Sequence, residues 1–426
     1  MSPTSPDAPA VTADFDGDCA RFASFWRDGG VGRDEARAAR RRFLTVHAGT
    51  LYGRITRGYS RFVRVERIVY EAAEAVPGLA PTRAEVAAES ERLQRDKAGL
   101  EIDQGILVSA ILADAHAGRH LCHAMLLPKP ESLERLPELE RHGRVDLGAA
   151  EVVREGKASI VVQKNPRHLN AEDDTTLAAA ETAVDLAILD PRTEVCVLRG
   201  GPVQSGRHAG LRVFGSGINL THLYYGKIPF LWYLERDLGV VSKIYRGLAR
   251  EDAPPDDVAG NTREKLWIAA VEGFAIGGHC QYLLVMDHVV AEESAYLTLP
   301  ARKEGIIPGA ANLRLARFTG DRIARQLVMA ERRLDCASPE GRLVCDELCA
   351  RGDMDAAIAR AVERLTTSGV VGAIANRRAF RLAQEPLDLF REYMALYAIE
   401  QAYCHFSPAL IDNLERYWNA KERKPV

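Results

Sequence analysis

Residues 267–308 read WIAAVEGFAIGGHCQYLLVMDHVVAEESAYLTLPARKEGIIP. Trp267–Val271 has the length and the apolar character of a buried strand, and Gly273 interrupts it. Gly277 and Gly278 then allow the backbone to turn sharply into a helix. The first N–H groups of a helix have no partner within it, and together with the helix dipole they favour negative charge. We therefore expect this turn to stabilise an oxygen that becomes anionic during a reaction.

A second glycine turn lies upstream, where residues 214–219 read FGSGIN after the apolar strand pattern of Val195–Leu198. Either turn alone is most often a plain chain reversal. Two strand-end turns whose N–H groups face one pocket, however, supply the pair of donors that an enolate oxygen requires. The two turns together therefore predict an oxyanion hole.

Four segments of the chain resemble signature segments of the crotonase (enoyl-CoA hydratase/isomerase) superfamily, in the same order and with similar spacing. They read NPRHLNA at 165–171, FGSGIN at 214–219, VEGFAIGGHCQ at 271–281, and GIIPG at 305–309 after Pro300. The resemblance implies an α/β fold with a crotonase-like ββα spiral core, an N-terminal helical domain and C-terminal helices. It also implies a CoA thioester whose carbonyl oxygen lies between the backbone N–H groups of Ile218 and Gly278.

Two positions depart from the hydratases of this superfamily. Hydratases carry one glutamate three residues after the second oxyanion glycine and another directly after the proline of the third segment, whereas this chain has Gln281 and Ala301 there. Glutamine does not take up a proton at neutral pH, so the addition of water lacks its acid and its base. The sequence therefore argues against an ordinary hydratase. Removal of an α-proton is left to the substrate's own acidity or to a displaced base.

The long N-terminal extension and the run from Lys157 to Leu334 are most similar to the cofactor-independent dioxygenases of the superfamily, which act on arylacetyl-CoA thioesters. The resemblance implies that the α-proton is lost, that the enolate passes an electron to O2, and that the peroxide formed at the α-carbon cleaves the thioester. CoA is then part of the substrate and O2 is the co-substrate. No metal or other cofactor is implied.

The resemblance also implies roles for particular residues. Glu172, Arg236 and Gln281 would hydrogen-bond ring hydroxyls of the substrate. The other implied contacts form three groups: Ser216, Gly217 and Asn219 at the thioester and pantetheine; Arg167 and His168 near the CoA nucleotide; and Ile218, Phe274, Ile276 and Leu299 around an apolar O2 pocket. His279, which follows Gly278 directly, receives no role.

Each of these positions also has an ordinary structural interpretation. Glu172 fits the first turn of a helix, where a carboxylate is favourable in any protein. Arg236 lies in the sequence LERD and fits a surface ion pair. The apolar residues of the O2 pocket fit an ordinary core. Gln281 is better supported, because it must lie within about one helical turn of Gly278.

The patterns divide the chain into an N-terminal helical domain (1–145), a crotonase-like core (146–330) and a C-terminal helical region (331–426). The first ~20 residues are acidic and proline-rich, which indicates a disordered tail and not a signal peptide. We expect the N-terminal helices to close over the pocket and shield the peroxide from water.

Within the N-terminal region, Thr82 and Glu85 form the capping-box pattern of a helix that Gly99 would end. A second helix is predicted from Ile102 to just before Pro128.

In the core region, Lys157–Gln163 and Val195–Leu198 have strand patterns, and Asn170 would cap the helix between them. This is the pattern of a β-α-β unit. Leu220–Leu248 is predicted to be a long helical region, and the pattern beyond Gly309 is helical nearly to the end of the chain.

His116, His120 and His123 recur at i, i+4 and i+7 of the second predicted helix, so their imidazoles lie near one face. A metal-dependent oxygenase would combine such ligands with a carboxylate. Asp114 lies about 200° from His116 around a helix and does not join them easily. Packing and hydrogen bonding are the ordinary interpretation of these histidines, and we predict no metal site.

The composition is that of a soluble globular protein of 426 residues, with 47% hydrophobic and 27% charged residues. The net charge of −3 argues against nucleic acid as a partner, and no apolar stretch approaches the roughly 20 residues that span a membrane. None of the eight cysteines forms a Cys-x-x-Cys pair, and Cys345 with Cys349 has the spacing of a packed helical pair. We therefore expect a reduced, cytoplasmic protein. The resemblance implies a homo-oligomer, either a trimer or a hexamer.

Three other functions remain open. A thioester hydrolase or isomerase of the same superfamily would act on an acyl-CoA without O2. A metal-dependent oxygenase would use the histidine helix and would be inhibited by chelators. A non-catalytic acyl-CoA-binding scaffold would bind a thioester analogue but release no CoA.

Overall fold

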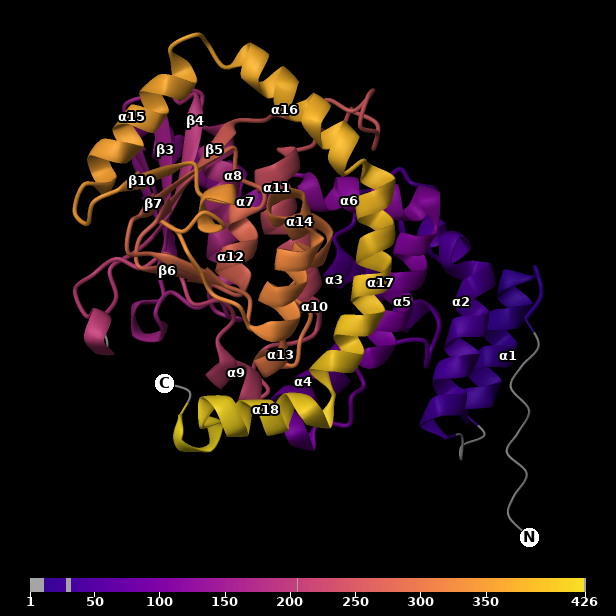
Figure 1. The fold of residues 1–426 in the computed structure, drawn as a ribbon. Helices are drawn as coiled ribbons and strands as arrows, with labels where there is room; N and C mark the ends of the chain where they lie inside the picture. Colours follow the sequence, from indigo (N-terminus) through magenta and orange to yellow (C-terminus); the bar gives the residue numbers. More distant parts are fainter. Residues whose placement is uncertain (1–10, 28–31, 205, 425–426) are drawn as a thin grey trace.

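The structure, a computed structural model, describes residues 11–27, 32–204 and 206–424. A mixed β-sheet with helices on both faces lies on one side of the molecule, and the first helices of the chain, α1 and α2, stand at the opposite end (Figure 1). Within the described ranges, no helix combines the length and the apolar character needed to cross a membrane.

The main sheet has seven strands in the order β1-β2-β3-β4-β5-β7-β10. β1, β2 and β3 pair antiparallel, whereas β3, β4, β5, β7 and β10 run parallel. β3, β4 and β5 are buried along their whole length, as parallel strands covered on both faces are. The strands are β1 (Arg144–Asp146), β2 (Ala150–Glu155), β3 (Ala158–Gln163), β4 (Val195–Gly200), β5 (Leu266–Val271), β7 (His288–Glu292) and β10 (Glu347–Cys349).

Two helices cover the faces of this sheet. Cys196 and Leu198 of β4 pack in the same core as α8 (Leu177–Leu189), whereas Val195 and Val197 pack with α15 (Met354–Thr366), because successive side chains of a strand point to opposite faces. α8 connects β3 to β4, which pair in parallel. The predicted β-α-β unit is therefore confirmed.

A second sheet positions the glycine turn. It consists of β6 (Phe274–Ile276), β8 (Tyr296–Thr298) and β9 (Leu334–Asp335). Gly273 (φ 67°) turns the chain from β5 into β6, and Gly277 (φ 55°) turns it from β6 into α12 (Gly278–Leu283). The strand, glycine turn and helix predicted from Trp267 onward are therefore confirmed.

Helices form the N-terminal region, as predicted, but the tail was predicted too long. α1 begins at Phe15, inside the predicted tail, while residues 1–10 lie outside the described residues. The helices are α1 (Phe15–Arg27), α2 (Arg33–Ile55), α3 (Val65–Ala75), α4 (Arg83–Ser90), η1 (Gln94–Asp96), α5 (Ile102–Ala113), α6 (Ala115–Leu126) and α7 (Pro130–His142).

Two helix predictions in this region need correction. The capping box of Thr82 and Glu85 is present, but α4 ends at Ser90 and does not reach Gly99. The helix predicted from Ile102 is broken into α5 and α6 at Asp114. The Asp114 carboxylate accepts a hydrogen bond from the Ala117 N–H (2.8 Å) and so caps a new helix.

Two single-residue predictions were wrong for long-range reasons. Asn170 does not cap α8, which begins at Leu177. Its side-chain amide instead donates hydrogen bonds to the carbonyls of Gly201 (2.7 Å) and Val213 (2.8 Å). These hydrogen bonds connect the loop of Asn170 to two segments that are distant in the sequence. Cys349 lies in β10 and not in a helix with Cys345, because strand pairing with β7 overrides the local pattern.

The predicted helical region at 220–248 is interrupted. It contains α9 (Leu220–Tyr224), α10 (Leu231–Glu235), a π-helical turn η4 (Arg236–Val241) and α11 (Ser242–Arg246). The predicted C-terminal helices are present, but β9 and β10 interrupt them. They are α13 (Ala301–Glu304), α14 (Ala311–Ala330), α15, α16 (Val371–Gln384), α17 (Leu387–His405) and α18 (Pro408–Trp418); the remaining short turns are η2 (Pro166–His168), η3 (Gly206–His208), η5 (Gly341–Leu343) and η6 (Ala420–Glu422).

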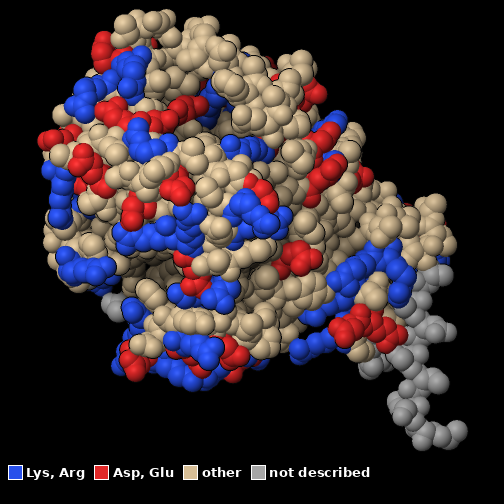
Figure 2. Space-filling model, viewed as in Figure 1, with Lys and Arg blue, Asp and Glu red and all other residues tan. Residues whose placement is uncertain are grey.

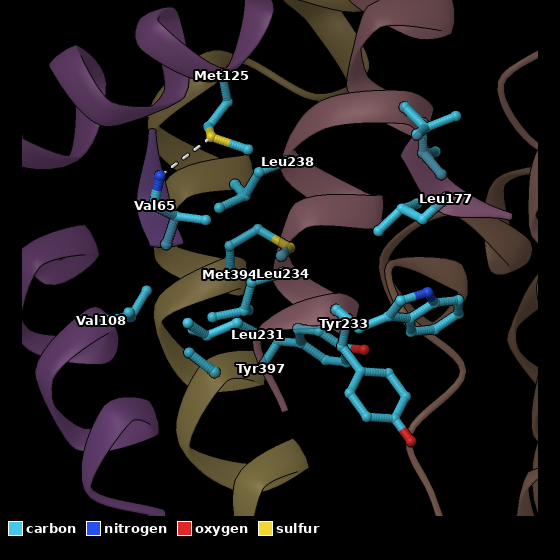
Figure 3. Close-up of a cluster of buried hydrophobic side chains, with 14 of the residues drawn as sticks. Val65, Val108, Met125, Leu177, Leu231, Tyr233, Leu234, Leu238, Met394 and Tyr397 are labelled. Atoms are coloured by element: carbon cyan, nitrogen blue, oxygen red, sulfur yellow. Dashed lines mark hydrogen bonds between the residues drawn. The ribbon is translucent and has the colours of Figure 1, made fainter. Parts of the chain in front are cut away.

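One hydrophobic core joins three distant parts of the chain (Figure 3). The N-terminal helices α3, α5 and α6, the central α10 and η4, and the C-terminal α17 all contribute to it: Val65, Val108 and Met125; Leu231, Leu234 and Leu238; Met394 and Tyr397. The backbone N–H of Val65 also contacts the Met125 sulfur (3.4 Å). The N-terminal helices therefore pack behind α10, η4 and α17.

Candidate active site

The two glycine turns lie against each other. Gly215 and Ala275 form a β-bridge between them, and a Cβ placed on Gly217 (φ 81°) would lie 3.2 Å from the Gly278 nitrogen. Within the described residues, the N–H groups of Ile218 and Gly278 donate no hydrogen bond. The structure therefore places the two predicted glycine turns side by side, each with an N–H group that is available to a ligand.

The segment that resembles a CoA-contacting loop is fastened to the first turn. The Glu172 N–H donates to the Gly217 carbonyl (2.7 Å), and the Asn219 N–H donates to the Glu172 carbonyl (2.8 Å). The Ser216 hydroxyl donates to the His168 carbonyl (3.1 Å). Three hydrogen bonds therefore hold this loop and the turn together.

His279 supports the first turn from behind. Its Nδ1 accepts a hydrogen bond from the Gly217 N–H (3.1 Å), and its Nε2 lies 3.0 Å from Gln163 Oε1, which assigns the proton to Nε2. Burial lowers the pKa of His279 to about 4, so the imidazole is neutral at neutral pH. A Cβ on Gly215 would lie 2.1 Å from this ring, so only glycine fits there. His279 thus fixes the turn that presents the Ile218 N–H.

Glu172, Arg236 and Gln281 meet at one end of the site, as predicted. Arg236 Nε donates to both carboxylate oxygens of Glu172 (2.9 and 3.0 Å), and its Nη1 donates to Gln281 Oε1 (3.0 Å). The Tyr282 hydroxyl donates to Glu172 Oε1 (2.7 Å). Glu172 lies in a loop, so its interpretation as the first turn of a helix is wrong. Arg236 is buried, so its interpretation as part of a surface ion pair is also wrong.

The charges of this group compensate each other. Burial alone would raise the pKa of Glu172, but the Arg236 guanidinium and the other neighbours keep that pKa below its usual value. The pKa of Arg236 is raised in turn, because the nearby Glu172 carboxylate outweighs the loss of water around the guanidinium. Glu172 is therefore a paired carboxylate and a weak base.

Arg236 also connects the polar end to the second oxyanion turn. Its Nη2 donates to the Gly278 carbonyl (2.7 Å). Arg236 opens the π-helical turn η4, and π-helical turns occur frequently at functional sites. This long-range contact cannot be read from the local sequence.

Two cavities meet at the oxyanion turns. An inner cavity of about 30 Å³ is lined by Glu172, Ile218, Arg236, Gly278 and Gln281, together with Tyr233 and Tyr397. An outer cavity of about 480 Å³ is lined by seven of the predicted residues: Arg167, His168, Ser216, Ile218, Asn219, Phe274 and Ile276. Ile218 and Glu304 line both cavities.

The outer cavity has a basic rim. Arg167, Arg207, Lys303 and Arg423 line it, and Figure 2 shows Lys and Arg side chains on both sides of a hollow above α18. Such a rim suits the phosphate groups of a nucleotide-like ligand.

Three of the four residues predicted around an O2 pocket, Ile218, Phe274 and Ile276, line the outer cavity. This cavity also has a polar wall. Leu299 is fully buried and lines neither of the two cavities. Gly217 also lies off both cavities, because its N–H points to His279.

The N-terminal helices do not line either cavity, because every lining residue follows position 166. They support the wall formed by α10, η4 and α17. The N-terminal helices were expected to cover the pocket, but in the structure they pack on the outer side of the helices that form its wall.

The three histidines of α6 are engaged elsewhere. His120 Nδ1 lies 2.8 Å from the Tyr52 hydroxyl, His123 Nε2 lies 2.9 Å from the Arg250 carbonyl, and His116 stacks on Tyr59. These contacts match their ordinary interpretation as packing and hydrogen-bonding residues.

Comparison with known proteins gives the class of this protein. The sequence profile of the enoyl-CoA hydratase/isomerase family matches residues 259–386. An enoyl-CoA hydratase from Mycobacterium avium subsp. paratuberculosis K-10 superposes with a TM-score of 0.51 at 21% identity, covering 63% of this chain and 98% of the other. A carnitinyl-CoA hydratase from Mycobacterium avium gives 0.51 at 23% identity, covering 66% and 98%. These two structures share the fold.

A more similar relative is the (3,5-dihydroxyphenyl)acetyl-CoA 1,2-dioxygenase of Amycolatopsis orientalis, which is 47% identical over 87% of this chain and 84% of its own length. The 2,3-dehydroadipyl-CoA hydratase of Escherichia coli (strain K12) is 27% identical over 42% of this chain and 60% of its own. The chain therefore belongs to the enoyl-CoA hydratase/isomerase family, the crotonase superfamily.

Proposed function

We propose that this protein is a cofactor- and metal-independent dioxygenase that converts 3,5-dihydroxyphenylacetyl-CoA and O2 into 3,5-dihydroxyphenylglyoxylate and CoA. The observation that carries the proposal is the pair of N–H groups of Ile218 and Gly278, which have no acceptor among the described residues. They lie between a basic outer cavity and the polar group of Glu172, Arg236 and Gln281. The relative that is 47% identical carries the name of this activity.

The chemistry begins with the thioester carbonyl oxygen between the two N–H groups. Loss of an α-proton moves an electron pair onto that oxygen, and the two donors stabilise the enolate; one such donor is typically worth about 3 to 4 kcal/mol. The enolate passes one electron to O2, and the two radicals combine into a peroxide at the α-carbon. The peroxide attacks the thioester carbon, the C–S bond breaks, and the O–O bond is cleaved. Both oxygen atoms remain in the glyoxylate, and the two α-hydrogens leave as protons.

The inner cavity is narrow, at about 30 Å³, so an aryl ring would enter it by displacing the side chains that line it. The Arg236–Gln281 hydrogen bond (3.0 Å) would be replaced by bonds to the ring hydroxyls. A ring without hydroxyls would leave these buried polar groups unpaired.

Several further assignments follow from the family resemblance. CoA enters as part of the substrate, and we propose a cytoplasmic homo-oligomer, a trimer or hexamer, without a nucleic acid or membrane partner. The product is a precursor of dihydroxyphenylglycine, which places the enzyme in vancomycin-type antibiotic biosynthesis. The alternative is a crotonase-type thioester hydrolase or isomerase, because neither hydratase glutamate is needed if water attacks the thioester directly.

Oxygen uptake decides between these functions. EDTA-treated protein with 3,5-dihydroxyphenylacetyl-CoA should consume O2 and release free thiol in a ratio of one to one. Thiol release without O2 uptake would instead establish the hydrolase, and loss of activity after chelation would establish a metal-dependent oxygenase.

The support that His279 gives to the first turn predicts a graded effect. His279→Leu should lower kcat by about 10- to 100-fold, because the Gly217 N–H loses its acceptor and the Ile218 donor loses its position. His279→Asn should retain more activity, because its Oδ1 can replace Nδ1 as the acceptor. Steady-state kinetics of both variants provide the measurement, and equal losses in the two would contradict this positioning role.

A further inference from the structure

One carboxyl group at the junction of the cavities has no role in the proposed function. Glu304, the last residue of α13, lines both cavities and is only 7% exposed. A Cβ placed on Gly277 would lie 3.6 Å from Glu304 Oε1, so the carboxyl group adjoins the second oxyanion turn. Within the described part of the chain its side chain makes no hydrogen bond or ion pair. A buried carboxyl group without a partner is costly and is a candidate for a functional role.

We propose that Glu304 is the base that removes the α-proton of the thioester. This assignment rests on the proposed function, because it takes the carbonyl oxygen to lie at the Ile218 and Gly278 N–H groups. With CoA in the outer cavity and the ring toward the inner one, the α-carbon, which joins the carbonyl carbon to the ring, comes to the junction that Glu304 lines. The carboxylate takes the proton, the electron pair of the C–H bond forms the C=C bond of the enolate, and the carbonyl π pair moves onto the oxygen. Glu304 ends as a neutral acid.

The position of Glu304 explains how the reaction proceeds without the usual glutamates. Hydratases of the superfamily carry a glutamate where this chain has Ala301, and Glu304 follows three residues later. Three residues are nearly one helical turn, and α13 spans these residues. The base is thus displaced by one turn along the same short helix.

The other candidate groups around the site are already engaged. Glu172 is paired with Arg236. Asp237 contacts Arg236 Nη1 (3.5 Å) and lines only the inner cavity. Both ring nitrogens of His279 have partners. Glu304 is therefore the available carboxylate at the junction.

Protonation of Glu304 gives the proposal a pH signature. The titratable and charged groups that line the two cavities with it are Glu172, Tyr233, Arg236, Asp237 and Tyr397 in the inner cavity, and Arg167, His168, Arg207, His208, Tyr296, Lys303, Tyr417 and Arg423 in the outer one. Lys303 is held by Glu331 (2.5 Å) and Arg236 by Glu172, so neither neutralises Glu304. Burial raises the pKa of Glu304 from the usual 4.5 to about 7. Because the carboxylate is the active form, the rate should rise with pH through about 7 and be constant above it.

The test is exchange of the α-hydrogens for deuterium, followed by NMR in D2O without O2, on 3,5-dihydroxyphenylacetyl-CoA. Glu304→Gln keeps the shape of the side chain and should slow exchange by at least ~100-fold, the usual contribution of a general base. Its dissociation constant for the thioester should change by less than about fivefold, since the backbone N–H groups remain. Asp412→Asn, an exposed carboxylate on the neighbouring α18, is the matched control and should exchange at the wild-type rate.

A second variant separates a catalytic role from a structural one. Glu304→Ala should regain exchange when formate is added, and its pH profile without formate should be flat. Exchange by Glu304→Gln at the wild-type rate, or a Glu304→Ala variant that formate does not rescue, would overturn the assignment.

The same experiment separates this inference from the proposed function. Wild-type protein that exchanges the α-hydrogens but consumes no O2, together with a Glu304→Gln variant that exchanges slowly, would refute the dioxygenase and retain Glu304 as the base. Wild-type protein that consumes O2 with a fully active Glu304→Gln variant would retain the dioxygenase and refute the base. Wild-type protein that neither exchanges the α-hydrogens nor consumes O2 would refute both the dioxygenase and Glu304 as its base.

Discussion

Gly278→Ala is expected to lower kcat/KM for the thioester by about 100- to 1,000-fold, the loss typical of one missing oxyanion donor. The new Cβ would lie 2.5 Å from Glu172 Oε2 and 3.0 Å from Arg236 Nη2. Both side chains are buried and hydrogen-bonded to each other, so they cannot withdraw without breaking the ion pair. The methyl group must therefore displace the turn, and the Gly278 N–H moves with it.

Steady-state kinetics with 3,5-dihydroxyphenylacetyl-CoA provide the measurement. Gly372→Ala is the matched control, because a Cβ on this glycine of α16 meets no atom within 4 Å, and it should behave as the wild type. A Gly278→Ala variant with unchanged kcat and only a raised KM would place the loss in ground-state binding and contradict an oxyanion role for this N–H.

Arg236→Met is expected to reduce the free energy of unfolding by about 3 to 5 kcal/mol, the usual cost of removing one partner of a buried ion pair. The Glu172 carboxylate would stay buried with only the Tyr282 hydroxyl as a strong donor. The Gly278 carbonyl would also lose its hydrogen bond from Arg236, so activity should fall to background. Urea denaturation and thioester turnover measure the two effects.

The double variant Glu172→Gln with Arg236→Met is the control for charge. It removes the uncompensated carboxylate, so it should recover a large part of the lost stability without recovering activity. A double variant as unstable as Arg236→Met alone would show that packing around the guanidinium, and not its charge, holds this region together.

The sequence predicted the second glycine turn well because its signals are local. A strand, a positive-φ glycine and a helix start follow one another within residues 267–283, and the structure has them in that order. The assembly of Glu172, Arg236 and Gln281 depends on contacts across many residues. Only the family resemblance predicts this assembly, because no local pattern distinguishes a buried arginine from a surface one.

The missed residues share a different property. His279 and Glu304 lie on helices of six and four residues, which are too short for a hydrophobic period to show which side faces the cavity. Asn170 was read as a cap because its true partners, the Gly201 and Val213 carbonyls, lie on other loops. The absence of the two hydratase glutamates was the one available signal that a base had to lie elsewhere.

The core shown in Figure 3 holds in place a part of the site that lies outside the segment matched by the family profile. The segment that matches the family profile, 259–386, contains the second oxyanion turn and Glu304, whereas Glu172 and Arg236 lie outside it. Arg236 follows α10 directly, and α10 packs on the N-terminal helices through Leu231 and Leu234. On the proposed function, we expect substitutions in α3 or α5, which do not line either cavity, to change which aryl ring is accepted without removing Glu304 or the second oxyanion turn. Substrate selectivity can therefore change through residues of the N-terminal helices that contact no substrate.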